Sequence, residues 1–174
     1  MAEFRWAYIG SGGIAKSTAM NIKKGNHKIV SVYSRTYEKA KSFADKYNAQ
    51  VCTNFEDAVN RDDVDGVYIA TPHTSHVEYA VKAMKMCKPV LCEKPVGVSL
   101  KDVDILINTA KETETYFCEA MWTWFSPVAL TVKEWVQSGE IGEIKDVIIN
   151  YVCPTIGAHA GPGVIAFFYE ADYK

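Results

Sequence analysis

The chain has 174 residues and a formal net charge of −2 at pH 7; 48% of its residues are hydrophobic and 23% are charged. This length allows one well-buried domain with a small appendage, and the composition is ordinary for a globular protein. The weak negative charge gives no basic field that would favour nucleic acid, and the apolar runs are shorter than the roughly 18 residues of a membrane span, so we expect neither nucleic acid nor membrane as a partner.

The N-terminus and the cysteines indicate a cytoplasmic protein. Residues 1–5 carry an acid and pass directly into a strand pattern, which is not typical of a signal peptide. The cysteines are odd in number, form no Cys-x-x-Cys pair and lie mostly in apolar runs. We therefore expect reduced thiols and no metal site.

Stretches typical of strands and helices alternate along the chain. In chain order we expect a strand at 4–10, a helix at 14–25 that stops at Gly25, a strand at 27–34, a helix at 37–48, a strand at 50–53, a helix at 55–60, a strand at 64–72, a helix from a capping box at Ser75 to residue 86, a strand at 88–95, a capped helix from Ser99 to residue 114, a strand at 115–122, a helix at 127–139, a strand at 144–153 and a loop at 154–163. Such alternation predicts an α/β fold, in which right-handed crossovers join parallel strands into a doubly wound sheet.

The first strand runs into Gly10-Ser11-Gly12-Gly13-Ile14-Ala15, which fits the pattern G-x-G-x-x-A. In a dinucleotide-binding domain Gly10 would make the turn out of the strand, Gly12 would let the backbone approach a pyrophosphate, and Ala15 would keep the helix close to the sheet. The free N–H groups of the helix start attract phosphate. The alternative is a tight turn without a ligand.

The second strand ends in Ser34-Arg35-Thr36, where an NAD-preferring site usually has Asp or Glu. A hydroxyl and a guanidinium can receive the 2′-phosphate of NADP, which a carboxylate would repel. The residues favour NADP, with NAD possible if Arg35 is a solvated loop residue.

Two further strand ends carry polar chemistry. The fourth strand leads into Thr71-Pro72-His73 and then His76, and the fifth leads into Glu93-Lys94-Pro95. Ligands of open α/β sheets bind beyond the carboxyl ends of the strands, and a lysine after a buried strand can have a lowered pKa. A cis Lys94–Pro95 bond would direct that lysine. The alternative is that these are solvated loop and helix-start residues.

In their order, G-x-G-x-x-A, "YSR", "YIATPHTSH", "CEKP" and "EAMWTWF" followed by "SGEIGEI" resemble the glucose-fructose oxidoreductase/inositol dehydrogenase/MocA family, and within it the NADP-linked sugar and dihydrodiol dehydrogenases. The resemblance extends from residue 4 to residue 152. It implies that Gly10, Gly12, Gly13 and Ile14 line the diphosphate and that Ser34 and Arg35 bind the adenosine phosphate. Thr71, Pro72 and His73 would lie along the nicotinamide ribose, with His76 close by. Glu93 and the catalytic Lys94 would lie at the nicotinamide and the substrate.

The resemblance also implies an oxidoreductase that moves hydride between nicotinamide and a hydroxyl-bearing carbon of a sugar, inositol or dihydrodiol. It divides the chain into a dinucleotide-binding domain, 1–120, and a linker helix with the start of a substrate and oligomerisation domain, 121–174. Met121, Trp122 and Trp124 would border the substrate, and homo-oligomers are common among relatives. The late His159 lacks the surroundings of the family's catalytic histidine.

Two other functions compete with this one. A non-catalytic NADP-binding module or sensor would use the same pocket, but it has no need of Glu-Lys-Pro at a strand end. A short-chain alcohol dehydrogenase is excluded because no Tyr-x-x-x-Lys pair lies in the second half of the chain.

Overall fold

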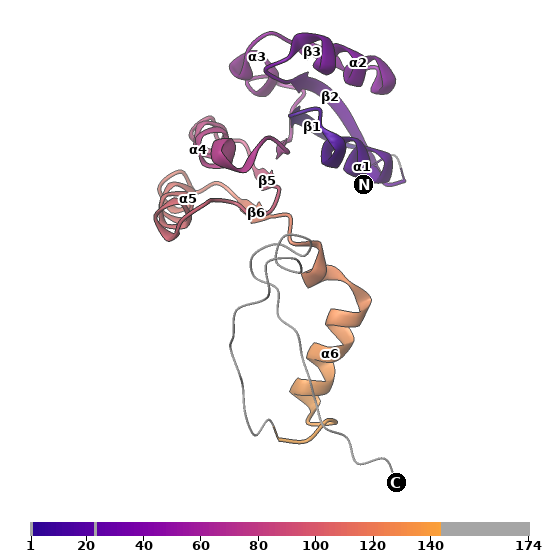
Figure 1. Ribbon diagram of the computed structural model, residues 1–174, viewed down its shortest axis with the longest axis vertical. Coiled ribbons are helices and arrows are strands. Elements are labelled where there is room, and N and C mark those ends of the chain that lie inside the picture. The colour runs from indigo at the N-terminus through magenta and orange to yellow at the C-terminus, as the bar shows by residue number, and fades with distance from the viewer. Residues whose placement is uncertain (1, 23, 144–174) are drawn as a thin grey trace. The chain divides into compact units, whose positions relative to one another are not determined.

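The computed structural model describes residues 2–22 and 24–143 (Figure 1). The chain divides into two compact units, Met1–Ala120 and Met121–Lys174. The predicted strand at 144–153, the loop at 154–163 and His159 lie outside the described residues.

The first unit alternates strands and helices in the order that the sequence predicts. Its elements are β1 (Phe4–Ile9), α1 (Gly13–Ile22), β2 (His27–Tyr33), α2 (Tyr37–Tyr47), β3 (Gln50–Cys52), α3 (Phe55–Val59), β4 (Gly66–Ile69), the 3-10 helix η1 (His73–Ser75), α4 (His76–Lys85), β5 (Val90–Cys92), α5 (Leu100–Glu112) and β6 (Phe117–Glu119).

These strands form one parallel sheet in the order β3-β2-β1-β4-β5-β6. The order confirms the predicted doubly wound fold. The chain starts in the middle of the sheet, builds outwards to β3, and then returns to the other side of β1 to place β4. The crevice outside the carboxyl ends of β1 and β4 is therefore the topological switch point, where ligands of such sheets bind.

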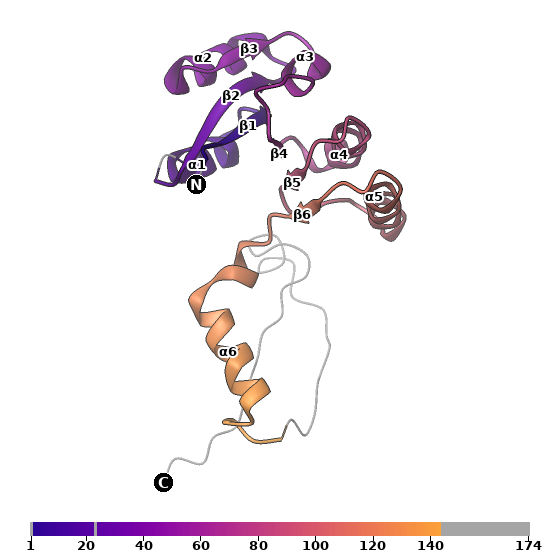
Figure 2. The same ribbon diagram turned by 180° about the vertical axis from the view of Figure 1, so that it is seen from behind.

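Helices cover both faces of the sheet, as Figures 1 and 2 show for α1 and α2 on one side and α4 and α5 on the other. The strands supply both cores because successive side chains point to opposite faces. On β1, Ala7 and Ile9 join the cluster under α3, α4 and α5, whereas Tyr8 joins the cluster under α1 and α2. Tyr68 of β4 lies beside Tyr8, with ring centroids 4.7 Å apart.

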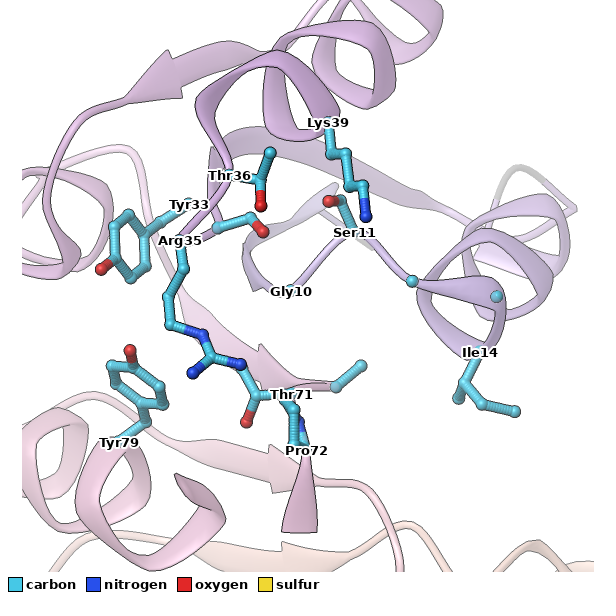
Figure 3. A pocket seen from close by; sticks show the side chains of 14 residues that line it. Gly10, Ser11, Ile14, Tyr33, Arg35, Thr36, Lys39, Thr71, Pro72 and Tyr79 are labelled. Carbon is cyan, nitrogen blue, oxygen red and sulfur yellow. The ribbon is translucent and has the colours of Figure 1, made fainter. Parts of the chain in front are cut away.

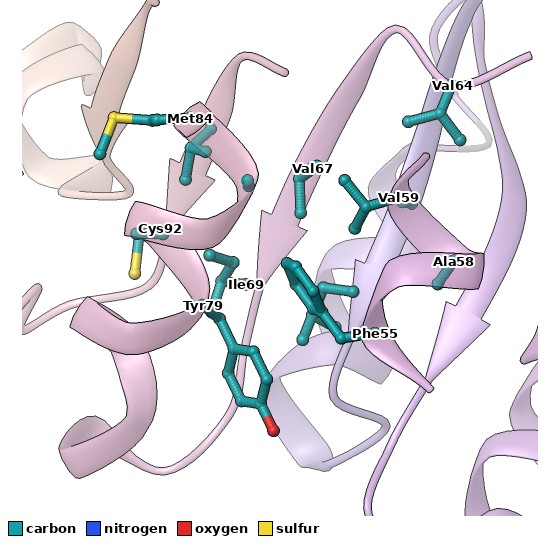
Figure 4. Packing of buried hydrophobic residues seen from close by; sticks show 14 of the residues in the cluster. Phe55, Ala58, Val59, Val64, Val67, Ile69, Tyr79, Met84 and Cys92 are labelled. Carbon is teal, nitrogen blue, oxygen red and sulfur yellow. The ribbon is translucent and has the colours of Figure 1, made fainter. Parts of the chain in front are cut away.

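The larger cluster lies under α3, α4 and α5 (Figure 4). The ring of Phe55 in α3 stacks on that of Tyr79 in α4, with centroids 5.1 Å apart, and Met84 and Leu106 are completely buried beside β5. Burying a large apolar side chain stabilises a fold by about 1.5–3 kcal/mol. This core holds α4 against β4 and β5, and thereby fixes the loops that follow both strands.

One helix end and one predicted side-chain cap differ from the sequence predictions, whereas the other helices end within about two residues of the predicted positions. Helix α1 ends at Ile22, three residues before the predicted stop at Gly25, because the chain enters a turn in which the Lys24 N–H donates to the carbonyl of Asn21. The predicted capping box at Ser75 is wrong, since the Ser75 hydroxyl donates to the carbonyl of Pro72 at 2.8 Å and Ser75 belongs to η1. The predicted cap at Ser99 is confirmed by its bond from the Asp102 N–H.

The described part of the second unit contains η2 (Trp122–Phe125) and α6 (Pro127–Ser138). Ser126 caps α6 by accepting from the N–H of Ala129, and Gly139, at φ 75°, ends it. The predicted helix at 127–139 is thus confirmed. None of the helices in the described ranges combines the length and the apolarity that crossing a bilayer requires.

Candidate functional site

The turn after β1 depends on Gly10. Its φ of +105° lies in the region that side chains disfavour, and its N–H donates to the carbonyl of Tyr33 at 2.8 Å. A Cβ at this position would also collide with the carbonyl group of Ala70, at the end of β4. Glycine is therefore required because the turn passes against the neighbouring strand end.

Close packing does not explain why residues 12 and 13 are glycines. A Cβ on either residue would meet no protein atom within 4 Å, so packing does not require glycine there. Helix α1 begins at Gly13 and has no acidic side chain in its first turn, and the first N–H groups of a helix lack intrahelical partners. The completely buried Ala15 and Ala19 hold the helix against the sheet. The arrangement leaves an exposed, positive backbone surface.

That surface opens into a cavity of about 360 Å³ across the switch point (Figure 3). Eight of the residues predicted for the site line this cavity: Gly10, Gly12, Gly13, Ile14, Ser34, Arg35, Thr71 and Pro72. Sequence reasoning missed six further lining residues, Ser11, Tyr33, Thr36, Lys39, Ala70 and Tyr79.

Two cations reach into the cavity from the β2 side. Arg35 extends towards Thr71 and Pro72, and Lys39 of α2 extends towards Ser11 (Figure 3). No carboxylate in the described ranges forms a salt bridge with either cation. Lys39 lies in the first turn of α2, the helix that begins just after Arg35, and its place there is the sequence signal that could have predicted it.

Two aromatic side chains of the cavity wall, Tyr33 and Tyr79, lie beside Arg35 (Figure 3). The rings of Tyr33 and Tyr79 meet edge to face with centroids 6.1 Å apart. Burial, together with the neighbouring Tyr33 hydroxyl, raises the pKa of Tyr79 to about 12. The Tyr79 phenol is therefore neutral at pH 7, and it forms no ion pair with the guanidinium of Arg35.

A second cavity of about 110 Å³ adjoins the first, with which it shares Ile14, Ala70 and Thr71. Its remaining lining residues are His73, His76, Glu93 and Lys94. The Lys94–Pro95 peptide bond is cis. The structure thus brings together the residues that the sequence places beyond β1, β2, β4 and β5. Met121, Trp122 and Trp124 belong to the second unit, where both tryptophans are about two-thirds exposed.

Glu93 is held by hydrogen bonds from two directions. The Tyr68 hydroxyl donates to its Oε1 at 2.6 Å, and the N–H of Lys94 approaches its Oε2 at 3.3 Å. The hydroxyls of Tyr68 and Thr18 are 2.9 Å apart. Burial, and then the bond to Glu93, raise the pKa of Tyr68, which therefore stays a neutral donor. Sequence reasoning placed Tyr68 only in a buried strand.

His76 is completely buried, and both of its ring nitrogens face protein oxygens. Nδ1 lies 2.8 Å from the carbonyl of Pro95, and Nε2 lies 2.9 Å from the carbonyl of Thr71. Its position at the start of α4 places it between the two strand-end loops.

The fold and the site together define a Rossmann-type dinucleotide-binding domain. The evidence is a doubly wound sheet with the 3-2-1-4-5-6 strand order, a glycine turn after β1, a helix start without acidic side chains in its first turn and an open cavity at the switch point.

Comparison with known families gives the same answer. Residues 4–120 match the model of the GFO_IDH_MocA family, described as an oxidoreductase family with an NAD-binding Rossmann fold. The chain belongs to this family, which confirms the resemblance that its motifs carry.

Similar proteins include dehydrogenases of diols and sugars. The chain is 27% identical to the trans-1,2-dihydrobenzene-1,2-diol dehydrogenase of Danio rerio over 92% of this chain and 51% of the relative, and 31% identical to the D-xylose 1-dehydrogenase (NADP(+)) of Hypocrea jecorina over 84% of this chain and 42% of the relative. KijD10, a 3-ketoreductase from Actinomadura kijaniata solved in complex with NADP, superposes with a TM-score of 0.73 and 26% identity over 82% of this chain and 44% of KijD10. The chain thus spans about half the length of these relatives.

Two neighbouring tyrosines provide a matched test of the bond to Glu93. Tyr8 is as buried as Tyr68, but its hydroxyl has no hydrogen-bond partner among the described residues. We expect Tyr68→Phe to lower the free energy of unfolding by about 1–2 kcal/mol, and Tyr8→Phe to leave it unchanged or raise it by up to about 1 kcal/mol. Urea unfolding of the two variants measures both values. An equal decrease in the free energy of unfolding in both variants would show that the hydrogen bond to Glu93 contributes nothing to stability.

Proposed function

We propose that this chain binds NADP in the two adjoining cavities at the switch point. One observation carries the proposal: the open cavity runs from the bare glycines at the start of α1 to the unpaired cations beyond β2. Backbone N–H groups at a helix start suit a diphosphate, and Cβ atoms at Gly12 or Gly13 would project into free space instead of protein.

The residues beyond β2 support NADP over NAD. Ser34, Arg35 and Lys39 line the adenosine end of the cavity, and no Asp or Glu lines it. A dianionic 2′-phosphate would accept charge-assisted hydrogen bonds from both cations. NAD would leave those cations without an anionic partner but would still fit the diphosphate turn, so it remains the weaker ligand.

The second cavity suits the nicotinamide half of the same molecule. Thr71, Pro72 and His73 would lie along the nicotinamide ribose, with Glu93 and Lys94 at the ring. When bound, the cofactor supplies hydride exchange at nicotinamide C4. Lys94 Nζ would contact the reacting hydroxyl, and Glu93 would be oriented by Tyr68. The protein's contribution is to hold the alcohol carbon in line with the ring.

The substrate class rests on the relatives. Their names specify a dihydrodiol and xylose, so we propose a dehydrogenase acting on the CH–OH group of a sugar, inositol or dihydrodiol. Residues 1–120 would form the cofactor domain, and residues 121–174 would begin the substrate domain, with Met121, Trp122 and Trp124 on the substrate side. A cytoplasmic homo-oligomer is the corresponding proposal for the whole protein.

The cofactor assignment is tested by titration with NADPH and NADH. We expect Arg35→Ala to weaken NADPH binding roughly 10- to 100-fold, the range set by a charge-assisted hydrogen bond, and to change NADH binding little. Lys41→Ala is the matched control, because Lys41 lies on α2 but pairs with Asp45 and does not line the cavity. Equal affinities for both nucleotides and no effect of Arg35→Ala would defeat the NADP assignment.

Lys94 separates a dehydrogenase from a non-catalytic NADP-binding module or sensor. With aldoses, inositols or dihydrodiols as substrates, we expect NADPH formation that falls at least about 100-fold in Lys94→Ala while NADP affinity is retained, because Lys94 acts on the hydroxyl. NADPH absorbance measures turnover. Tight NADP binding by the whole protein, with its complete substrate domain, but no turnover on any of the three substrate classes would favour the module.

A further inference from the structure

The two contacts of the His76 ring constrain its protonation state. A neutral imidazole carries one N–H donor and one bare nitrogen, which is an acceptor. Both ring nitrogens of His76 lie at hydrogen-bond distance from carbonyl oxygens, 2.8 Å to Pro95 and 2.9 Å to Thr71, and a carbonyl oxygen can only accept. In either neutral tautomer one nitrogen lone pair would therefore face an oxygen lone pair. Only the doubly protonated ring donates to both.

The groups around the His76 ring determine the free-energy cost of a positive charge on it. His73, Glu93 and Lys94 are the other titratable groups lining the same small cavity, and the His73 ring lies 5.6 Å from that of His76. Glu78, in the first turn of α4, pairs with Lys82. The positive end of α4 and the Lys94 ammonium oppose a cation here, whereas the two carbonyl dipoles and the Glu93 carboxylate favour it. Complete burial also disfavours a charged ring, whereas each of the two carbonyl oxygens would accept a charge-assisted hydrogen bond from it.

The two carbonyls belong to the loops that frame the second cavity. The carbonyl of Thr71 lies just beyond β4, before Pro72 and His73, and the carbonyl of Pro95 immediately follows Lys94. Within the described chain no backbone hydrogen bond joins residues 71–73 to residues 94–95. The His76 ring thus links these two loops through its hydrogen bonds to the carbonyls of Thr71 and Pro95.

We propose that His76 is a positioning residue, a buried imidazolium that donates to the carbonyls of Thr71 and Pro95 and so holds the Lys94 loop at a fixed place beside the Thr71–His73 loop. The sequence suggested His76 as a cofactor neighbour. In this role it acts through Thr71 and Lys94, because both of its nitrogens are already engaged by protein.

The protonation state is measured directly by ¹H–¹⁵N NMR of the histidine side chains in the unliganded 174-residue chain at pH 7, with the signals assigned by comparison with His76→Gln. We expect both ring nitrogens of His76 to carry protons and to show the ¹⁵N shifts of an imidazolium. A single N–H with the shifts of a neutral tautomer would overturn the proposal. This measurement needs no nucleotide, so its result is independent of the proposed function.

The positioning role rests on the proposed function and is tested with two ligands. In His76→Gln we expect NADPH affinity to fall about tenfold, as for the loss of one hydrogen bond to a charged donor, while the affinity for 2′,5′-ADP, which lacks the nicotinamide half, stays the same. An equal loss for both ligands would show a general structural effect and overturn the role.

His27→Gln is the matched control, because His27 is exposed at the start of β2 and lines neither cavity; its affinities for both ligands should equal those of the unmodified chain. If the unmodified chain binds neither ligand, the proposed function fails, and the NMR result still decides the protonation state of His76.

Discussion

The contact between the turn at Gly10 and the carbonyl of Ala70 constrains the whole site. It joins the end of β1 to the end of β4, the two strands between which the sheet reverses its direction of growth. Because Gly10 has no side chain, the turn can pack directly against the end of β4. This packing places the start of α1 at the crevice. The open cavity, the exposed helix start and the approach of the β4 loop all follow from this close packing.

Around that turn the chain distributes charge unevenly. Arg35 and Lys39 lie at one end of the crevice without carboxylate partners among the described residues, whereas Glu93 at the other end is engaged by Tyr68. An anion is therefore favoured at the β2 end. At the β5 end, polar groups are held in defined orientations by hydrogen bonds, which is the arrangement that a reacting centre requires.

The sequence was sufficient for the features that depend on local pattern. Alternating apolar runs and helix signals predicted the doubly wound sheet, and the strand-end positions of Ser34, Thr71 and Lys94 predicted that they would gather at one edge. It was insufficient where a side chain had two possible partners. Ser75 has the spacing of a helix cap, yet its hydroxyl bonds to Pro72, because the chain first makes a turn of 3-10 helix.

Contacts between strands and loops that are far apart in the chain also could not be predicted from the sequence. Tyr68 meets Glu93 only because β4 pairs with β5, and His76 meets Pro95 only because the loop after β5 passes the start of α4. No spacing in the chain encodes these distances. They appear once the sheet order is known.

The most direct measurement of the central claim is a crystal structure of the chain grown with NADP. The account predicts diphosphate oxygens within hydrogen-bond distance of the backbone N–H groups at Gly12 to Ile14, the 2′-phosphate at Arg35, and the nicotinamide ring beside Lys94. A nucleotide bound elsewhere, or a nicotinamide ring remote from Lys94, would contradict it.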